Sequence, residues 1–187
     1  MKRMNVIGIL VILGAVTGCV TPGGSTVAEK RTYALDMAAR TMDDLEAEKP
    51  GIKQRAEAAP GYAVFSNVES KIFMIASGNG YGVVHDNRTG KKTYMRMAEV
   101  GGGIGLGVKS LRMVFVFNEA EALDRFIEDG IQIGGDADAA ATTGDDGIVA
   151  GADVTLDSVD VYQLTDSGLA LSATISGTKY WVDSELN

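Results

Sequence analysis

Apolar residues recur at spacings of three and four between residues 27 and 49, which is the period of an amphipathic helix. Acidic residues in the second half of this stretch indicate a solvated outer side, and Pro50-Gly51 ends the pattern. A second, shorter helical stretch is expected over residues 52–59. The first helix should therefore pack on the rest of the chain through one apolar stripe, which consists of Leu35, Ala38, Met42 and Leu45.

From Pro60-Gly61 onward the pattern changes to short apolar or alternating runs, which predict antiparallel strands. Turn signals at Asn79-Gly80 and at residues 86–90 separate neighbouring runs. The runs lie at residues 62–67, 72–78, 81–86, 92–98 and 111–117, and further short runs follow beyond residue 130.

One more helix interrupts the strands, over residues 118–130. Asn118 can cap its start, Glu121 completes a capping box, and Gly130 ends it. Its apolar face consists of Leu123, Phe126 and Ile127. The whole pattern predicts an α+β fold: a mostly antiparallel β-sheet or a barrel-like core, with the N-terminal helix and this internal helix packed on it.

Residues 99–110, EVGGGIGLGVKS, invite a phosphate-binding interpretation. Val108 separates Gly107 from Lys109, which breaks the P-loop spacing, and the strict period of two breaks the dinucleotide fingerprint. Period two is typical of a strand, here with one face bare except for Lys109 at its end. Such a strand marks a bend or the close approach of another group. We expect a neighbouring element to approach it, rather than a lipid headgroup or chain.

The first residues resemble an export signal. Lys2 and Arg3 precede an apolar run of 11 residues, too short to cross about 30 Å of hydrocarbon as a helix. The segment VTGC, ending at Cys19, resembles the lipobox of bacterial lipoproteins, in which the cysteine receives diacylglycerol and becomes the mature N-terminus. An ordinary secretory signal with a chance cysteine, and a buried free thiol, are the alternatives.

These features divide the chain into three parts. Residues 1–18 are expected to be a lipoprotein signal peptide, 19–26 a Gly-rich tether beginning at the lipid-modified Cys19, and 27–187 a single domain. A protein anchored by more than one acyl chain stays on its membrane. Val20 follows the cysteine in place of aspartate, which favours the outer membrane of a bacterial envelope, facing the periplasm.

Charge is unevenly distributed along the mature chain. Residues 19–112 hold 13 basic and 10 acidic side chains, whereas residues 113–187 hold 2 basic and 15 acidic ones. This polarity would orient the domain near an anionic surface. Because the chain is acidic and nucleic acid is also negatively charged, we expect no nucleic acid to bind.

Little in the sequence points to catalysis or to a cofactor. His85 is the single histidine and Cys19 the single cysteine, so a typical zinc site or a Cys/His pair cannot be assembled. We expect His85 at a strand end near solvent. The aspartates around residues 136–146 lack the third ligand and the glycine of a calcium loop, so they are interpreted as solvated turn charges. The chain is therefore predicted to be no enzyme and to hold no metal or cofactor.

Six segments in a fixed order give the chain a resemblance to the SYLF domain, a lipid-binding family of eukaryotic phosphoinositide-binding proteins and bacterial envelope lipoproteins. The segments are APGYAVFSN (59–67), SGNGYGVV (77–84), GGGIGLGVKS (101–110), VFVFNEAEALDRF (114–126), GGDADAA (134–140) and SGLALSATISG (167–177). Residues 71–76 depart from the family, which is usually Gly-rich there. The resemblance implies antiparallel strands with helices packed on them, and binding of phospholipid headgroups. It supplies no catalytic residues.

Basic side chains are the candidate contacts to lipid headgroups, since each lysine or arginine near an anionic membrane contributes about 1 kcal/mol. Solvated surface charge is the alternative interpretation of the same residues. The expected function is that of a non-catalytic, membrane-anchored lipoprotein that binds phospholipid; a scaffolding lipoprotein acting through protein contacts is the main alternative, and its protein partners are unknown. The candidates are Lys49, Lys53 and Arg55 before the first strand, Arg88, Lys91, Lys92 and Arg96 around one hairpin, and Lys109.

Overall fold

The computed structural model describes residues 21–130, 132–133, 154–156, 158–165, 168–169 and 177–187. Its helices are α1 (Val27–Glu48), α2 (Ile52–Ala58) and α3 (Ala120–Asp129). Its strands are β1 (Gly61–Asp86), β2 (Lys92–Phe117), β3 (Gln132–Ile133), β4 (Val154–Leu156), β5 (Val159–Thr165), β6 (Gly168–Leu169) and β7 (Gly177–Val182).

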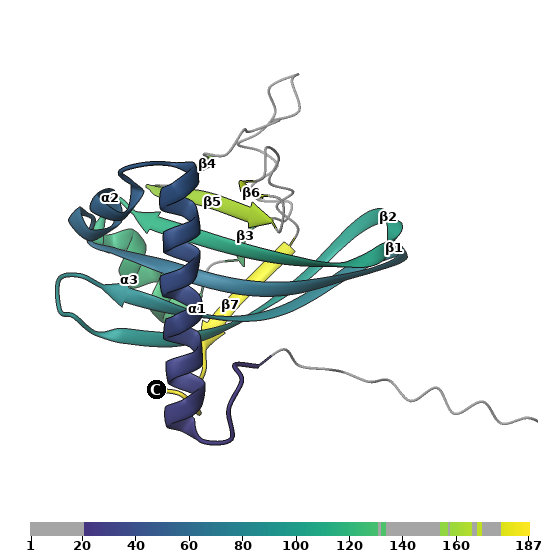
Figure 1. Ribbon diagram of the computed structural model, residues 1–187, viewed down its shortest axis with the longest axis horizontal. Helices are drawn as coiled ribbons and strands as arrows, with labels where there is room; N and C mark the ends of the chain where they lie inside the picture. Colours follow the sequence, from purple (N-terminus) through teal and green to yellow (C-terminus); the bar gives the residue numbers. More distant parts are fainter. Residues whose placement is uncertain (1–20, 131, 134–153, 157, 166–167, 170–176) are drawn as a thin grey trace, which may run out of the picture.

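The strands form one antiparallel sheet in the order β3-β7-β2-β5-β4, with β1 paired to β2 and β6 paired to β5. α1 crosses one face of this sheet and α3 lies behind it, as Figure 1 shows. The predicted α+β class is therefore confirmed. Of the two architectures that the sequence left open, the open sheet is the one observed, because β3 and β4 stand at opposite ends of the strand order.

β1 and β2 form one long ribbon that runs out to one end of the molecule and returns (Figure 1). Their register extends from Gly61 opposite Phe117 to His85 opposite Lys92. The two halves of β1 lie against each other, since a Cβ on Gly80 would stand 2.2 Å from the backbone oxygen of Ser66. Asn79-Gly80 is thus strand and not the predicted turn: glycine is there for close packing.

The predicted turn after residue 86 is confirmed. The Asp86 N–H donates to the Lys91 carbonyl at 3.0 Å, and Gly90 adopts φ +73°, a conformation that favours glycine. Asp86 also accepts from the Arg88 backbone N–H at 2.9 Å, as short acidic side chains do in turns. We call residues 86–91 the basic turn, because Lys91 and its neighbour Lys92 lie at its end.

The glycine stretch at residues 99–110 lies within β2, so the strand prediction is confirmed. Its residues 101–107 pair with residues 71–76 of β1, the run that departs from the SYLF pattern, and Phe73 stands opposite Gly105. The register shifts between Phe73 and Ile75, which marks an irregularity in the ribbon. Glycines therefore occupy the part of β2 where the two strands change register.

Side-chain caps define α1 and join it to α2. The Thr26 hydroxyl accepts from the Glu29 N–H at 3.2 Å, and the Glu29 carboxylate accepts from the Thr26 N–H at 3.1 Å, a capping box. Near the other end, the Glu46 carboxylate accepts from the N–H groups of Gly51 and Lys53, at 2.8 and 2.9 Å. This carboxylate satisfies the start of α2 and fixes the angle between the two helices.

α3 differs from its prediction at its N-terminus. Its N-cap residue is Glu119, without a side-chain cap, whereas Asn118 donates its amide to Asp160 on β5 at 3.1 Å. The predicted Asn118 cap and its capping box are therefore wrong, because a long-range partner takes the amide. The predicted end is confirmed: Gly130 has φ +63°, and a Cβ there would stand 1.9 Å from the Tyr180 carbonyl oxygen.

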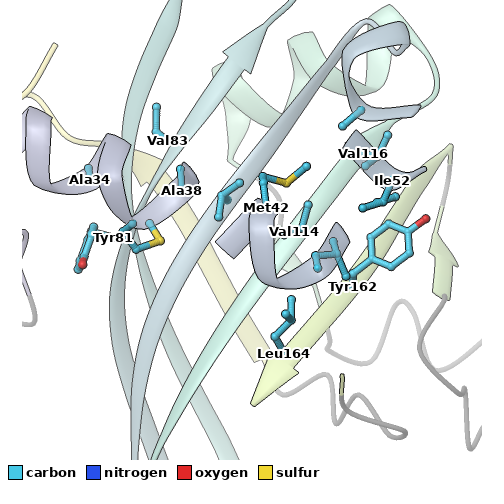
Figure 2. Close-up of a cluster of buried hydrophobic side chains, with 14 of the residues drawn as sticks. Ala34, Ala38, Met42, Ile52, Tyr81, Val83, Val114, Val116, Tyr162 and Leu164 are labelled. Carbon is cyan, nitrogen blue, oxygen red and sulfur yellow. The ribbon is translucent and has the colours of Figure 1, made fainter. Parts of the chain in front are cut away.

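Two hydrophobic clusters cover the two faces of the sheet. The α1-side core packs α1 on valine, leucine and tyrosine side chains of the strands, as Figure 2 shows for Ala34, Ala38 and Met42 of the helix. Leu45 is fully buried, as the helical stripe predicts, and Leu35 is partly buried. The α3-side core gathers Phe65, Phe115, Phe117, Phe126 and Tyr180 under α3.

Candidate functional site

α1 leaves a groove on each of its flanks. The turn-side groove lies between α1, α2 and the strand ends beside the basic turn; it has a volume of about 430 Å³ and is lined by Asp36, Asp43, Lys53, Tyr62, His85 and Lys92 among others. The tip-side groove lies on the other flank, toward the far end of the β1–β2 ribbon. Its volume is about 370 Å³, and its lining includes Tyr33, Arg40, Asp44, Ser66, Tyr81 and Arg112. Both volumes lie in the range of small-molecule sites.

His85 belongs to the turn-side groove. Its ring stacks on Tyr62 with a centroid separation of 4.6 Å, and its Nε2 atom is buried without a hydrogen-bond partner in the described part of the chain. Burial, together with the nearby positive charge of Lys92, lowers the pKa of His85 to about 4. The histidine is at a strand end, as predicted, and its side chain is half-buried: Tyr62 stacks on the ring, which also lines the open turn-side groove.

The predicted cations around α2 interact with side chains of the protein. Lys53 forms an ion pair with Asp43, and Arg55 forms one with Asp160, a buried residue of β5. The ammonium group of Lys49 lies 5.0 Å from the ring centroid of Tyr162, a cation–π arrangement. These three residues therefore join α1, α2 and β5 to one another.

Arg88 and Arg96 are also paired. Arg88 contacts Asp86 at 3.0 Å and Asp124 of α3 at 2.5 Å, so it fastens the basic turn to α3. The hydrogen bonds from Arg88 hold the pKa of Asp86 down at about 2. Arg96 contacts the buried Asp183 at 2.7 Å and Glu185 at 3.5 Å.

Two of the predicted cations stand apart from the others. Lys91 and Lys92 are exposed, and neither forms an ion pair with any residue that the structure describes. Lys109 lies in β2, but its side chain is outside what is described, as are Cys19 and the aspartates around residues 136–146. The structure thus separates the candidates instead of gathering them into one patch, and leaves a lysine pair at the basic turn.

Sequence reasoning missed the tip-side groove. Tyr33, Met37, Arg40 and Asp44 line it at helical spacings of three and four, so they share one flank of α1. The sequence shows this spacing, but it does not show the residues opposite on the sheet, because Tyr81 reaches Ser66 and Arg112 only through the folding back of the ribbon. Ser66 and Arg112 are Cα partners in the sheet.

Two kinds of feature are absent from the residues that the structure describes. No helix among them is both long and apolar enough to cross a bilayer. No group of three histidine, cysteine, aspartate or glutamate side chains among them could hold a metal ion.

Comparison with known proteins supports the resemblance read from the sequence motifs. Residues 98–187 match the family model Ysc84, described as Las17-binding protein actin regulator, which is the SYLF family. The chain is 34% identical over 167 residues to beta cell expansion factor A of Aeromonas veronii. The match covers 86% of this chain and 60% of that protein, so the chain spans less than two thirds of the relative. The family-model match identifies residues 98–187 as a SYLF domain, and the similarity to beta cell expansion factor A extends over most of the chain.

Proposed function

We propose that this chain is a lipid-anchored protein of the bacterial envelope whose SYLF domain binds phospholipid headgroups and catalyses no reaction. The SYLF domain match over residues 98–187 supports the lipid-binding part, because the sequence motifs resemble a lipid-binding domain. The signal-like residues 1–18 and Cys19 support anchoring, with the outer membrane favoured by Val20. The actin regulation in the family description is not carried over, because an envelope lipoprotein would meet no actin.

The observation that carries the proposal is the lysine pair beside the basic turn. Most of the other predicted cations already have carboxylate partners, whereas Lys91 and Lys92 project from the turn without one among the described residues. Two adjacent ammonium groups without carboxylate partners form a small positively charged patch on a protein of net charge -8. An anionic bilayer attracts such a patch when the two are within about one Debye length of each other.

Vesicle binding tests the lipid-binding part. The mature chain from residue 19, carrying Cys19→Ser so that no acyl chain contributes, should sediment with vesicles of phosphatidylglycerol and much less with phosphatidylcholine. Lys91→Glu with Lys92→Glu should lower the affinity at least about 10-fold, and salt should weaken the parent's binding. Lys91→Glu alone is to be compared with Lys179→Glu, which makes the same charge change on exposed β7. Equal losses for these two single variants would remove the basic turn from the site.

Lipid attachment is tested separately in cells. Cys19→Ser in the full chain should abolish labelling by a radioactive fatty acid and leave uncut precursor, because the thiol is the expected acceptor. Undiminished labelling of that variant would reject the anchor. The two experiments are independent, so either half of the proposal can fail alone.

A further inference from the structure

The tip-side groove combines groups that suit an anion. The Arg40 guanidinium lies on the exposed flank of α1 and forms no ion pair with any residue the structure describes. Arg112 contributes a second guanidinium, held by an ion pair with Asp44. Because a guanidinium has five N–H donors, Arg112 retains donors after it has satisfied one carboxylate.

Hydroxyl groups converge at the floor of this groove. The rings of Tyr33 and Tyr81 lie 6.0 Å apart, and Ser66 lies beside Tyr81 on the adjoining half of β1. The pKa of Tyr81 is raised, mainly by burial and then by the Tyr33 hydroxyl, while the Ser66 hydroxyl and the charge of Arg40 act in the opposite direction. The four groups are therefore close enough to act on one another, and on a ligand bound among them.

Two arginines and two aspartates line this groove, and both aspartates already have ion-pair partners. Asp44 pairs with Arg112, and Asp43 pairs with Lys53 from the other flank. Arg40 is thus the charged group of the lining that no described carboxylate engages, and its guanidinium remains available to an anion. A ligand that complements this groove carries one negative charge and several hydrogen-bond acceptors, and few donors, because the carboxylates that could receive donors are already engaged.

We propose that the tip-side groove is a binding site for a phosphodiester monoanion, with Arg40 as its principal cation and the Tyr33 hydroxyl and Arg112 as further donors. This inference rests on the proposed function, since it takes the phosphodiester to be that of a phospholipid headgroup. A phosphodiester has the required single charge and free oxygens, and guanidinium groups bind phosphate oxygens through two parallel hydrogen bonds.

The position of the groove permits this use. Arg40 lies 14 residues beyond Thr26, which places it about 21 Å along α1. The tether from Cys19 to Thr26 reaches at most about 25 Å when extended. A lipid-anchored chain can therefore lay this flank of α1 on the bilayer surface, where headgroup phosphates lie.

Titration with a soluble headgroup tests the site. The probe is glycerophosphoglycerol, a monoanionic phosphodiester without acyl chains, added to the mature Cys19→Ser chain and followed by NMR or calorimetry. Arg40→Gln should weaken binding at least about 10-fold, as expected for loss of a charge-assisted pair. Arg40→Lys should restore part of it, and Tyr33→Phe should weaken it about 3-fold. Arg125→Gln on α3 makes the same change of charge on another element and should leave the affinity unchanged.

Several results would overturn the inference. They are failure of the parent to bind the probe, equal affinities of Arg40→Gln and parent, and tighter binding of inorganic phosphate than of the diester. Each variant should melt at the parent's temperature, because Arg40 and Tyr33 are exposed; Tyr33→Phe supplies a second, milder variant if Arg40→Gln fails to fold.

The vesicle assay separates this inference from the proposed function. If phosphatidylglycerol vesicles bind the parent while the soluble diester does not, the groove is rejected and the proposed function stands. If the diester binds through Arg40 while the vesicles bind neither parent nor variant, the proposed function fails, and the lipid source of the phosphodiester fails with it. Loss of both diester and vesicle binding in Arg40→Gln supports the inference in full.

Discussion

The two faces of the sheet are packed with different kinds of side chain. Under α3, aromatic rings contact one another, from a centroid separation of 4.8 Å between Phe65 and Tyr180 to 6.0 Å between Phe65 and Phe126. Under α1, the helix contributes alanines and methionines. Large rings pack against one another on the α3 face, whereas α1 presents mainly alanines and methionines to the sheet and has a groove on either flank.

This difference suggests a division of tasks between the faces. Fully buried aromatic side chains contribute most to core stability, and Phe126 and Leu123 of α3 are completely buried. The α1 face holds the grooves, the half-buried histidine and the groups that we assign to the ligand. Changes on the α3 face should therefore act on stability, and changes beside α1 should act more on binding and on pH dependence.

The largest effect is expected from Phe126→Ala. Removing a ring that contacts Phe115, Phe117 and Tyr180 leaves a cavity among rigid neighbours, so the free energy of unfolding should fall by about 3–5 kcal/mol. Chemical denaturation of variant and parent measures this difference in the free energy of unfolding. Phe126→Leu is the control and should recover much of the loss; a loss below about 1 kcal/mol for the alanine variant would contradict the contrast between the faces.

Met42→Ala on the opposite face should cost less, about 2 kcal/mol, the lower end for methionine in a core. Met42 is buried but also lines the turn-side groove, so the space it leaves opens to water instead of forming a sealed cavity. The same denaturation experiment compares it with Phe126→Ala. A cost equal to that of the aromatic variant would show that α1 is packed as rigidly as α3.

His85 should make stability depend on pH. Its folded pKa of about 4 lies below its ordinary value of 6.5, so between these pH values the unfolded chain binds the proton more readily. Stability should be constant above pH 6.5 and should fall as the pH decreases toward 4. For a fully buried ring, the free energy of unfolding would fall by about 3 kcal/mol over this pH range. Because solvent reaches part of the His85 ring, the expected fall is about 1–2 kcal/mol. His85→Phe should remove this part of the pH dependence of stability, whereas the contributions of the carboxyl groups should remain. An unchanged pH dependence in the variant would show that His85 is not its source.

The smallest effect on stability is expected from Asp44→Asn, below about 1 kcal/mol, because its pair with Arg112 is partly exposed. Binding should change in the other direction: with the carboxylate gone, the tip-side groove gains positive charge and should hold the soluble diester more tightly. Glu48→Gln removes a charge from an exposed residue near the end of α1 and serves as the control. Unchanged or weaker diester binding in Asp44→Asn would count against the groove.

Local signals predicted the helices well, and long-range contacts explain the errors. Pro50-Gly51 and Gly130 end their helices because backbone conformation alone stops them there. Asn118 was assigned as a cap because its partner on β5 lies 42 residues away. Asn79-Gly80 matched a turn, yet Gly80 is needed where the other half of β1 passes, which no local pattern reveals.

The candidate site was less accessible to sequence analysis than the fold. Clusters of lysine and arginine can be read directly, but their carboxylate partners cannot: Arg55 and Asp160 are 105 residues apart. Conversely, Arg40 stands among acidic residues in a helix and resembles ordinary surface charge. Only the folded structure shows that Asp43 and Asp44 have other partners and that Arg40 shares a groove with Tyr81.

The last residues of the chain fasten the beginning of α1. Arg31 donates to the Leu186 carbonyl at 2.8 Å, Lys30 lies 3.9 Å from Glu185, and the Leu186 side chain is buried under α1. If a membrane anchor at Cys19 pulls on the tether, the load enters the domain at Thr26, close to this clasp. The tension would therefore act first on residues 183–187, and their hydrogen bonds with Arg96 and Tyr94 would pass it to β2. These contacts reinforce the end of α1 that is closest to the anchor.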